Sequence, residues 1–194
     1  MAKRIVVIEG HPDPEGGHLC DGLADAYAQG ATEAGHTVER FDIARLDFPL
    51  LRTKDDFEKG TIPAMLRPCQ QAIDQADHLL IIFPLWLGGM PAILKEFCEQ
   101  IFRPGFAFDY RARGLPVKKM KGKSARIVVT MGMPAAVYRW YFRAHGLKNL
   151  KRNILGFCGF GPVRDTLFGM VEGASEKTRR SWLERMRALG RSAG

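Results

Sequence analysis

Three loops rich in glycine and proline hold the residues best suited to bind a ligand. One of them, at 85–90, reads LWLGGM and follows the apolar run at 79–83. Pro84 ends that run because proline has no amide hydrogen to donate to a sheet. An apolar loop with a tryptophan at the carboxyl end of a parallel strand is a common ligand position in open α/β sheets. The pattern therefore predicts a site for a flat aromatic ligand beside Trp86.

A second loop, at 10–18, reads GHPDPEGGH and joins a β-branched run at 3–9 to an apolar-periodic segment at 18–34. Backbone amides and the positive end of a helix meet at such a loop, which makes it a natural anion site. Its glycine spacing matches neither a dinucleotide-binding fingerprint nor a P-loop. A tight strand-to-helix turn without a ligand remains the alternative.

The third loop, at 131–134, reads MGMP and follows the apolar run at 124–130.

The motifs of the chain favour a cofactor that carries its own chemistry over hydrolysis. The sequence has neither a GxSxG nor an HExxH signature, and it has no metal-binding spacing. A flavin would fit all three loops, with its phosphate at the first, its ring against the second and its polar edge against the amides of the third. The ring contacts would come from Pro84, Leu85, Trp86 and Leu87, and the polar contacts from Thr130, Met131, Gly132 and Met133.

Four aromatic residues are closely spaced at 102–110, after the helix that is expected to begin at Pro91. Phe102, Phe106, Phe108 and Tyr110 follow one another closely. They either pack on the core or form the wall of a pocket for a planar substrate, and Phe106 and Phe108 are the candidates for substrate binding.

The elements that must position these loops alternate along the chain. Strands are expected at 3–9, 37–43, 79–83, 124–130 and 154–161, and helices at 18–34, 62–75, from Pro91 onward and at 175–189. This alternation predicts one α/β domain over residues 1–194, with a doubly wound, flavodoxin-like, five-stranded parallel sheet. The expected strand order is 2-1-3-4-5, which places a ligand above strands one, three and four, where the three loops are.

Composition narrows the classes of function. The net charge is +8, but its two basic clusters, at 111–126 and 177–191, lack stacking aromatics or a recognition motif, so nucleic acid is not expected as a partner. The four cysteines show no CxxC pairing, which is typical of buried free thiols in a reducing cytoplasm. The start of the chain reads as a strand rather than a signal peptide, and no segment is long and apolar enough to cross a bilayer. A cytoplasmic protein is expected.

Several motifs together resemble a known family. They are FPLWLGGMPAILK followed by FRPGFAF, HPDP after the first strand, MG-x-P with a tyrosine shortly after it, and GFCGFG. This set is similar to the flavodoxin-like NAD(P)H:quinone oxidoreductases of the DT-diaphorase type, with related bacterial quinone reductases and the ancillary proteins of potassium efflux systems. The resemblance covers the chain up to about residue 175. It implies a homodimer with two flavin sites at the subunit interface.

The resemblance also implies roles for single residues. Tyr138 would donate to the flavin at its pyrimidine edge, with His145 as its partner or proton source, although a core aromatic and a surface or capping histidine are the alternatives. The chain differs from the family in its first loop, where Gly16-Gly17-His18 replaces a Ser-Phe-Asn type of sequence, and at Met133, where the family has a second glycine. Contacts to the phosphate and ribityl chain would come from His11, His18, Leu19 and Cys20.

Three functions are compatible with these patterns. The first is a flavin-dependent NAD(P)H:quinone oxidoreductase that transfers two electrons by a ping-pong mechanism, with FMN favoured over FAD because no extension follows the final helix. The second is a flavin-binding regulatory subunit that docks on a membrane transport system. The third, a flavodoxin-type electron carrier, is less favoured because such a carrier does not need an aromatic wall.

Overall fold

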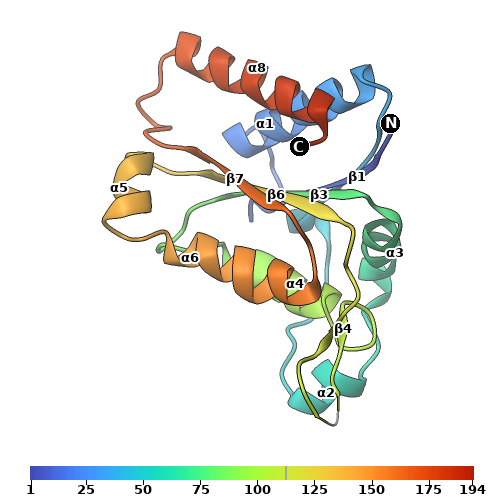
Figure 1. Cartoon of the computed structure of the whole chain (residues 1–194). Helices are drawn as coiled ribbons and strands as arrows, with labels where there is room; N and C mark the ends of the chain where they lie inside the picture. The colour runs from blue at the N-terminus through green and yellow to red at the C-terminus, as the bar shows by residue number, and fades with distance from the viewer. Residues whose placement is uncertain (112) are drawn as a thin grey trace.

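A computed structural model describes residues 1–111 and 113–194 of the chain. Its centre is a five-stranded parallel sheet with the order β2-β1-β3-β6-β7 (Figure 1), which confirms the predicted flavodoxin-like order. β1, β3 and β6 lie inside the sheet, and their side chains are buried almost without interruption, as in other parallel sheets covered on both faces. The strands are β1 (Arg4–Glu9), β2 (Thr37–Asp42), β3 (His78–Pro84), β6 (Ser124–Thr130) and β7 (Val163–Phe168).

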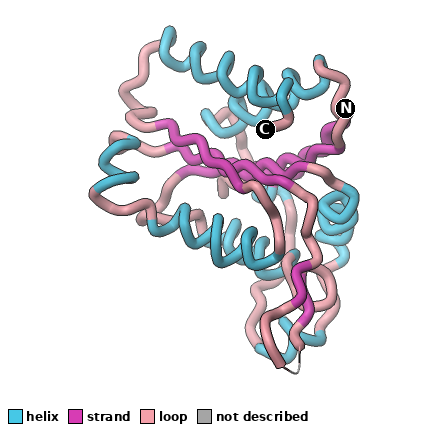
Figure 2. Tube along the Cα trace, in the orientation of Figure 1, coloured by secondary structure: helices cyan, strands magenta, loops and turns pink. Residues whose placement is uncertain are grey.

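Helices cover both faces of the sheet, as Figure 2 shows. One face carries α1 (Leu19–Glu33) and α8 (Glu176–Ser192), which lie against each other (Figure 1). The two helices can approach closely because glycine stands at the contact points. A Cβ added at Gly30 would lie only 1.9 Å from the carbonyl oxygen of Arg187, and one added at Gly190 only 2.0 Å from that of Tyr27. The other face carries α3 (Arg67–Gln75), α4 (Ala92–Ile101), and a continuous segment of α6 (His145–Lys148), η3 (Asn149–Leu155) and α7 (Gly156–Cys158).

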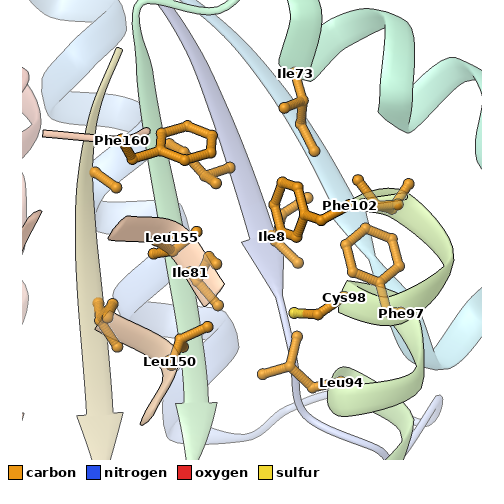
Figure 3. Close-up of a cluster of buried hydrophobic side chains, with 14 of the residues drawn as sticks. Ile8, Ile73, Ile81, Leu94, Phe97, Cys98, Phe102, Leu150, Leu155 and Phe160 are labelled. Carbon is orange, nitrogen blue, oxygen red and sulfur yellow. The ribbon is translucent and has the colours of Figure 1, made fainter. Parts of the chain in front are cut away.

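The larger hydrophobic core lies between the sheet and this second set of helices. Ile8 and Ile81 project from the sheet toward Leu94 and Phe97 of α4 and Leu150 of η3 (Figure 3). Each of these side chains is almost fully buried. Burying one side chain of this size stabilises a fold by about 1.5–3 kcal/mol, so the sheet and α4 form a rigid support for the loops between them.

The strand predicted at 154–161 is wrong. This segment is helical through Cys158, and the fifth strand is β7, which begins at Val163. The apolar residues of the segment are spaced for one face of a helix, and Leu150, Leu155 and Cys158 are buried under the sheet. β7 itself is an edge strand that carries charged side chains, so its amphipathic pattern is weaker than the apolar run before it.

Short elements fill the regions between the main layers. The stretch at 42–59 contains η1 (Ile43–Arg45) and α2 (Lys54–Lys59). The helix expected from residue 62 begins as η2 (Ala64–Leu66) before α3. The basic cluster at 111–126 contains β5 (Val117–Lys118), which pairs with β4 (Phe108–Asp109). Ala112, within that cluster, lies outside the described residues. The last of the short elements is α5 (Ala135–Trp140).

All four cysteines are free and buried, as predicted. Burial raises the pKa of Cys69 to about 11 and the pKa of Cys98 and Cys158 to about 12, so these side chains are neutral thiols. The cytoplasmic location inferred from them stays a prediction. In the part of the chain described here, no helix combines the length and the apolar character that crossing a membrane requires.

Candidate functional site

The three glycine- and proline-rich loops meet at one edge of the sheet. The amide of Gly10, after β1, donates to the carbonyl of Ile82 in β3 over 2.7 Å. The amide of Leu85, after β3, donates to the carbonyl of Thr130 in β6 over 2.8 Å. Because parallel strands end on the same side, these bonds bring all three loops together above β1, β3 and β6.

Two histidines organise the first loop. The rings of His11 and His18 stack with their centroids 3.7 Å apart and their planes 15° from parallel. Nε2 of His18 lies 2.9 Å from Oδ2 of Asp13. Burial, and then the neighbouring His18, lower the pKa of His11, which keeps its imidazole neutral at neutral pH. The pair is half-buried and places ring nitrogens beside the start of α1.

A buried carboxyl group that sequence reasoning missed lies beneath this loop. Glu9 ends β1 with its side chain almost fully buried, and its Oε1 accepts a hydrogen bond from the amide of His11 over 2.9 Å. Burial raises the pKa of Glu9 from 4.5 to about 7. The group therefore exchanges a proton near neutrality, next to the predicted anion site. A glutamate that ends an otherwise apolar strand is the signal that could have identified it.

An ion-pair network fixes the start of α1, and this too was missed. Oδ2 of Asp21 accepts from the amide of His18 over 2.9 Å, and Oδ1 of Asp21 accepts from Nη2 of Arg40 over 3.0 Å. Arg40, on β2, also pairs with Asp42 and Asp25. Such charge-assisted bonds are stronger than neutral ones, so they fix the position of the first turn of α1 relative to β2.

Cys20 faces the core rather than the loop surface. It is buried, and its Sγ lies 3.4 Å from Oγ1 of Thr130. Burial raises the pKa of Cys20 to about 12. Its side chain therefore ties α1 to the end of β6, while Leu19 before it is half-buried. Leu19 and Cys20 are the first two residues of α1, so their backbone amides have no acceptor within the helix and are available to an anion.

The second loop is a tight turn that presents Trp86. The amide of Trp86 donates to the carbonyl of Gly89 over 3.0 Å, and the amide of Gly89 donates back over 2.9 Å. Leu87 and Gly88 have φ values of 45° and 80°, which is the left-handed geometry of a type I′ turn. Trp86 is 52% exposed, and its ring meets that of His11 edge-on with centroids 6.5 Å apart. The turn thus adjoins the first loop, with Leu87 fully exposed at its tip.

Tyr138 supports this turn from behind. It is 1% exposed, its hydroxyl donates to the carbonyl of Gly88 over 3.3 Å, and the same oxygen accepts from the amide of Leu147 over 3.1 Å. Burial raises the pKa of Tyr138, which keeps the phenol protonated. A Cβ added at Gly146 would lie 2.2 Å from the carbonyl oxygen of Gly88, so only glycine allows α6 to approach this closely. The only proton of the Tyr138 hydroxyl is therefore committed to the turn.

His145 lies at the start of α6 and is exposed. The two residues before it, Arg143 and Ala144, have φ values of 54° and 49°, a conformation that is costly for residues with a Cβ. This strained link reverses the chain between α5 and α6. His145 directly precedes Gly146, the residue that packs against the carbonyl of Gly88, and its side chain forms no hydrogen bond to any described residue.

The third loop offers backbone donors. The amide of Met131 donates to Phe168, whereas the amides of Gly132 and Met133 meet no protein acceptor among the described residues. The carbonyl of Met133 accepts from the amide of Met170 over 3.1 Å, which fixes the loop against the chain after β7. Pro84 and Leu85 lie beside it and are half-buried. The edge therefore combines an anion position, an apolar aromatic surface and free amide donors, which is the set of contacts that a flavin needs.

Phe106 and Phe108 do not join this site within one chain. Phe108 lines a separate cavity of about 190 Å³, between α4 and α7, with Lys95, Cys98 and Phe157. Its ring contacts that of Phe157 edge-on with centroids 4.8 Å apart. Phe106 is half-buried and packs against the larger core. Both residues therefore pack with the larger core of their own chain, which is the first of the two alternatives that the sequence left open, and their role in substrate binding stays a prediction.

A sequence model of the flavodoxin-like fold family matches residues 3–189. The chain belongs to this family. A protein of Haemophilus influenzae named as an NAD(P)H oxidoreductase is 26% identical over 166 residues, which cover 84% of this chain and 82% of that protein. The ribosyldihydronicotinamide dehydrogenase [quinone] of Pongo abelii is 25% identical in an alignment that covers 96% of this chain and 92% of that protein.

The fold of this flavodoxin-like protein also matches solved structures. Smu.1420 from Streptococcus mutans UA159 superposes with a TM-score of 0.81 and 29% identity over 97% of this chain and 98% of the other. Together with the relatives, this confirms membership of the flavodoxin-like NAD(P)H:quinone oxidoreductases, which the sequence motifs indicated. The protein is therefore an oxidoreductase enzyme.

Proposed function

We propose that this enzyme reduces quinones with electrons from NAD(P)H, through a flavin held above β1, β3 and β6. The names of the relatives support quinone and nicotinamide nucleotide as the substrates. The observation that carries the flavin is the combination at one edge of an exposed Trp86 surface and the free amides of Gly132 and Met133. A bound flavin supplies the two-electron chemistry that links the two substrates in a ping-pong cycle.

Residues of all three loops would hold the cofactor. The amides of Leu19 and Cys20 and the rings of His11 and His18 form one anion position, which fits the single phosphate of FMN better than the longer FAD. Trp86 and Leu87 would cover one face of the ring and exclude water from it. The amides of Gly132 and Met133 would donate to its polar edge, where preorganised donors stabilise negative charge as it develops. Pro84, Leu85, Thr130 and Met131 would complete the contacts.

Tyr138 would act as a positioning residue. Its hydroxyl holds the carbonyl of Gly88, so it sets the position of the turn that carries Trp86. A direct catalytic donation from Tyr138 would require this bond to be released first. His145 is exposed beside the turn and is the candidate proton source for the reaction.

A homodimer would bring the aromatic wall to the site. Phe106, Phe108 and their cavity lie away from the loops of their own chain. A second copy could place this wall over the exposed face of the partner's ring site and enclose a planar quinone there. Sedimentation of the flavin-loaded protein tests this: a dimer supports the arrangement, and a monomer with full quinone reductase activity contradicts it.

The cofactor and the reaction are tested together. The purified protein is heated, the released cofactor is identified by its absorption spectrum and mass, and oxidation of NADPH is followed with menadione as the acceptor. FMN and rapid turnover are expected, and Trp86→Ala is expected to lower flavin affinity, whereas Leu50→Ala, an exposed apolar position away from the three loops, is the matched control. A colourless protein that binds neither FMN nor FAD in a calorimeter would overturn the proposal.

A further inference from the structure

Three consecutive aromatic side chains project from the corner of the molecule that α5 forms. Trp140, Tyr141 and Phe142, here called the aromatic triplet, are 78%, 79% and 48% exposed. The rings of Tyr141 and Phe142 meet edge-on with centroids 5.0 Å apart. α5 lies at the outer margin of the fold, at the left of Figure 1, next to the carboxyl edge of the sheet. Exposed large aromatics in a row are unusual on a protein surface and indicate a contact with another molecule.

A basic groove lies directly beside the triplet. It has a volume of about 440 Å³ and is lined by Trp140 together with Arg139, Arg143, Lys148, Lys151, Arg152 and the carboxylate Asp165. Asp165 pairs with Arg139 at 2.6 Å and with Lys151 at 2.8 Å. Within the described part of the chain, Arg143, Lys148 and Arg152 form no ion pair. The groove therefore keeps a surplus of positive charge for an anionic partner.

We infer that the triplet and the basic groove together bind the surface of an anionic lipid bilayer. Tryptophan and tyrosine favour the boundary between headgroups and acyl chains, because one end of each ring is apolar and the other polar. Cations beside them attract anionic headgroups, and the groove is wide enough for a headgroup phosphate. The triplet is carried at a projecting corner, which suits a flat bilayer rather than an extended peptide. Docking here would turn the carboxyl edge of the sheet toward the membrane, where apolar quinones dissolve.

Vesicle binding tests this inference directly, without any assay of turnover. The full-length, flavin-loaded protein is mixed with vesicles of phosphatidylglycerol and phosphatidylcholine in equal parts, or of phosphatidylcholine alone, and the bound fraction is measured by sedimentation. Binding is expected only to the anionic vesicles and should weaken with salt. Arg143→Gln with Lys148→Gln should weaken binding about 30-fold, from the usual contribution of each cation near an anionic surface.

Two further variants separate a bilayer from other partners. Replacing all three aromatics by serine should weaken binding by about tenfold or more, since apolar insertion is then lost. Lys54→Gln with Lys121→Gln removes the same charge at exposed positions on α2 and before β6, and should leave binding unchanged. Equal loss in this control, or no effect of the serine variant, would overturn the inference, because charge alone would then explain the binding, as for an acidic protein. A serine variant that changes from dimer to monomer would instead assign the triplet to contact with a second copy and would equally overturn it.

Discussion

Glu9→Gln should change how the stability of the protein depends on pH. The pKa of Glu9 is raised from 4.5 to about 7 by burial, against a partial offset from the His11 amide. Below about pH 4.5 the folded and unfolded chains both hold the proton, and as the pH rises the unfolded chain loses it first. The folded state then binds more protons than the unfolded state, so the stability of the parent falls until the pH passes about 7.

The size of the stability change follows from the difference between the two pKa values of Glu9. This difference corresponds to about 3 kcal/mol of unfolding free energy. Relaxation around the charge, with Arg40 nearby, reduces that energy to about 1–2 kcal/mol. Glutamine has no such titration, and its amide oxygen can still accept from the His11 amide. As the pH rises from about 5 to about 8, the unfolding free energy of the variant should therefore increase by about 1–2 kcal/mol relative to that of the parent.

Urea unfolding followed by circular dichroism measures this difference. Both proteins are compared across the pH range, with Glu39→Gln, at an exposed position on β2, as the control for the loss of one acidic group. Parallel curves for the parent and Glu9→Gln would refute the reasoning, and so would an equal change in slope for Glu39→Gln.

Three other predictions concern the supports of the site and the packing of the fold. Tyr138→Phe leaves the Leu147 amide and the Gly88 carbonyl without their partner, so it should cost about 1–3 kcal/mol in unfolding free energy and weaken flavin binding; unchanged flavin affinity would remove the positioning role. Gly30→Ala should destabilise the protein by about 2 kcal/mol or more because its Cβ meets the backbone of α8. Gly22→Ala, whose Cβ meets only Leu183 at 3.6 Å, should be neutral or stabilising in the same melting experiment. The thiols of the native protein should resist a thiol-specific alkylating reagent at neutral pH until denaturant is added, and rapid labelling of Cys20 in the native state would contradict its raised pKa.

Sequence patterns predicted the sheet and the loops well because both depend on local signals. The β-branched runs of β1 and β6, and the prolines and glycines after the strands, are unambiguous where a strand is buried on both faces. The strand order followed from the alternation of elements and the handedness of crossovers. The fifth strand was missed because an apolar run cannot by itself distinguish a buried helix from a strand, and Leu155 belongs to the former.

The contacts of single side chains were less predictable. Tyr138 was found by its motif, but its hydrogen bonds depend on how α5, α6 and the turn at Gly88 pack, which no local pattern encodes. Glu9 and Arg40 were missed because their importance comes from neighbours on other strands. Phe108 was found as an aromatic candidate, yet its distance from the loops follows from the path of the chain through the β4–β5 hairpin.

The pairing of α1 with α8 has a consequence for how the protein is made. Arg187 and Glu33, which join the two helices, are 154 positions apart. During synthesis, α1 emerges early, and its contact with α8 can form only after the end of the chain has left the ribosome. Contacts of such long range slow folding and prolong the exposure of apolar surface. The layer formed by α1 and α8 is therefore completed only when the end of the chain has been made.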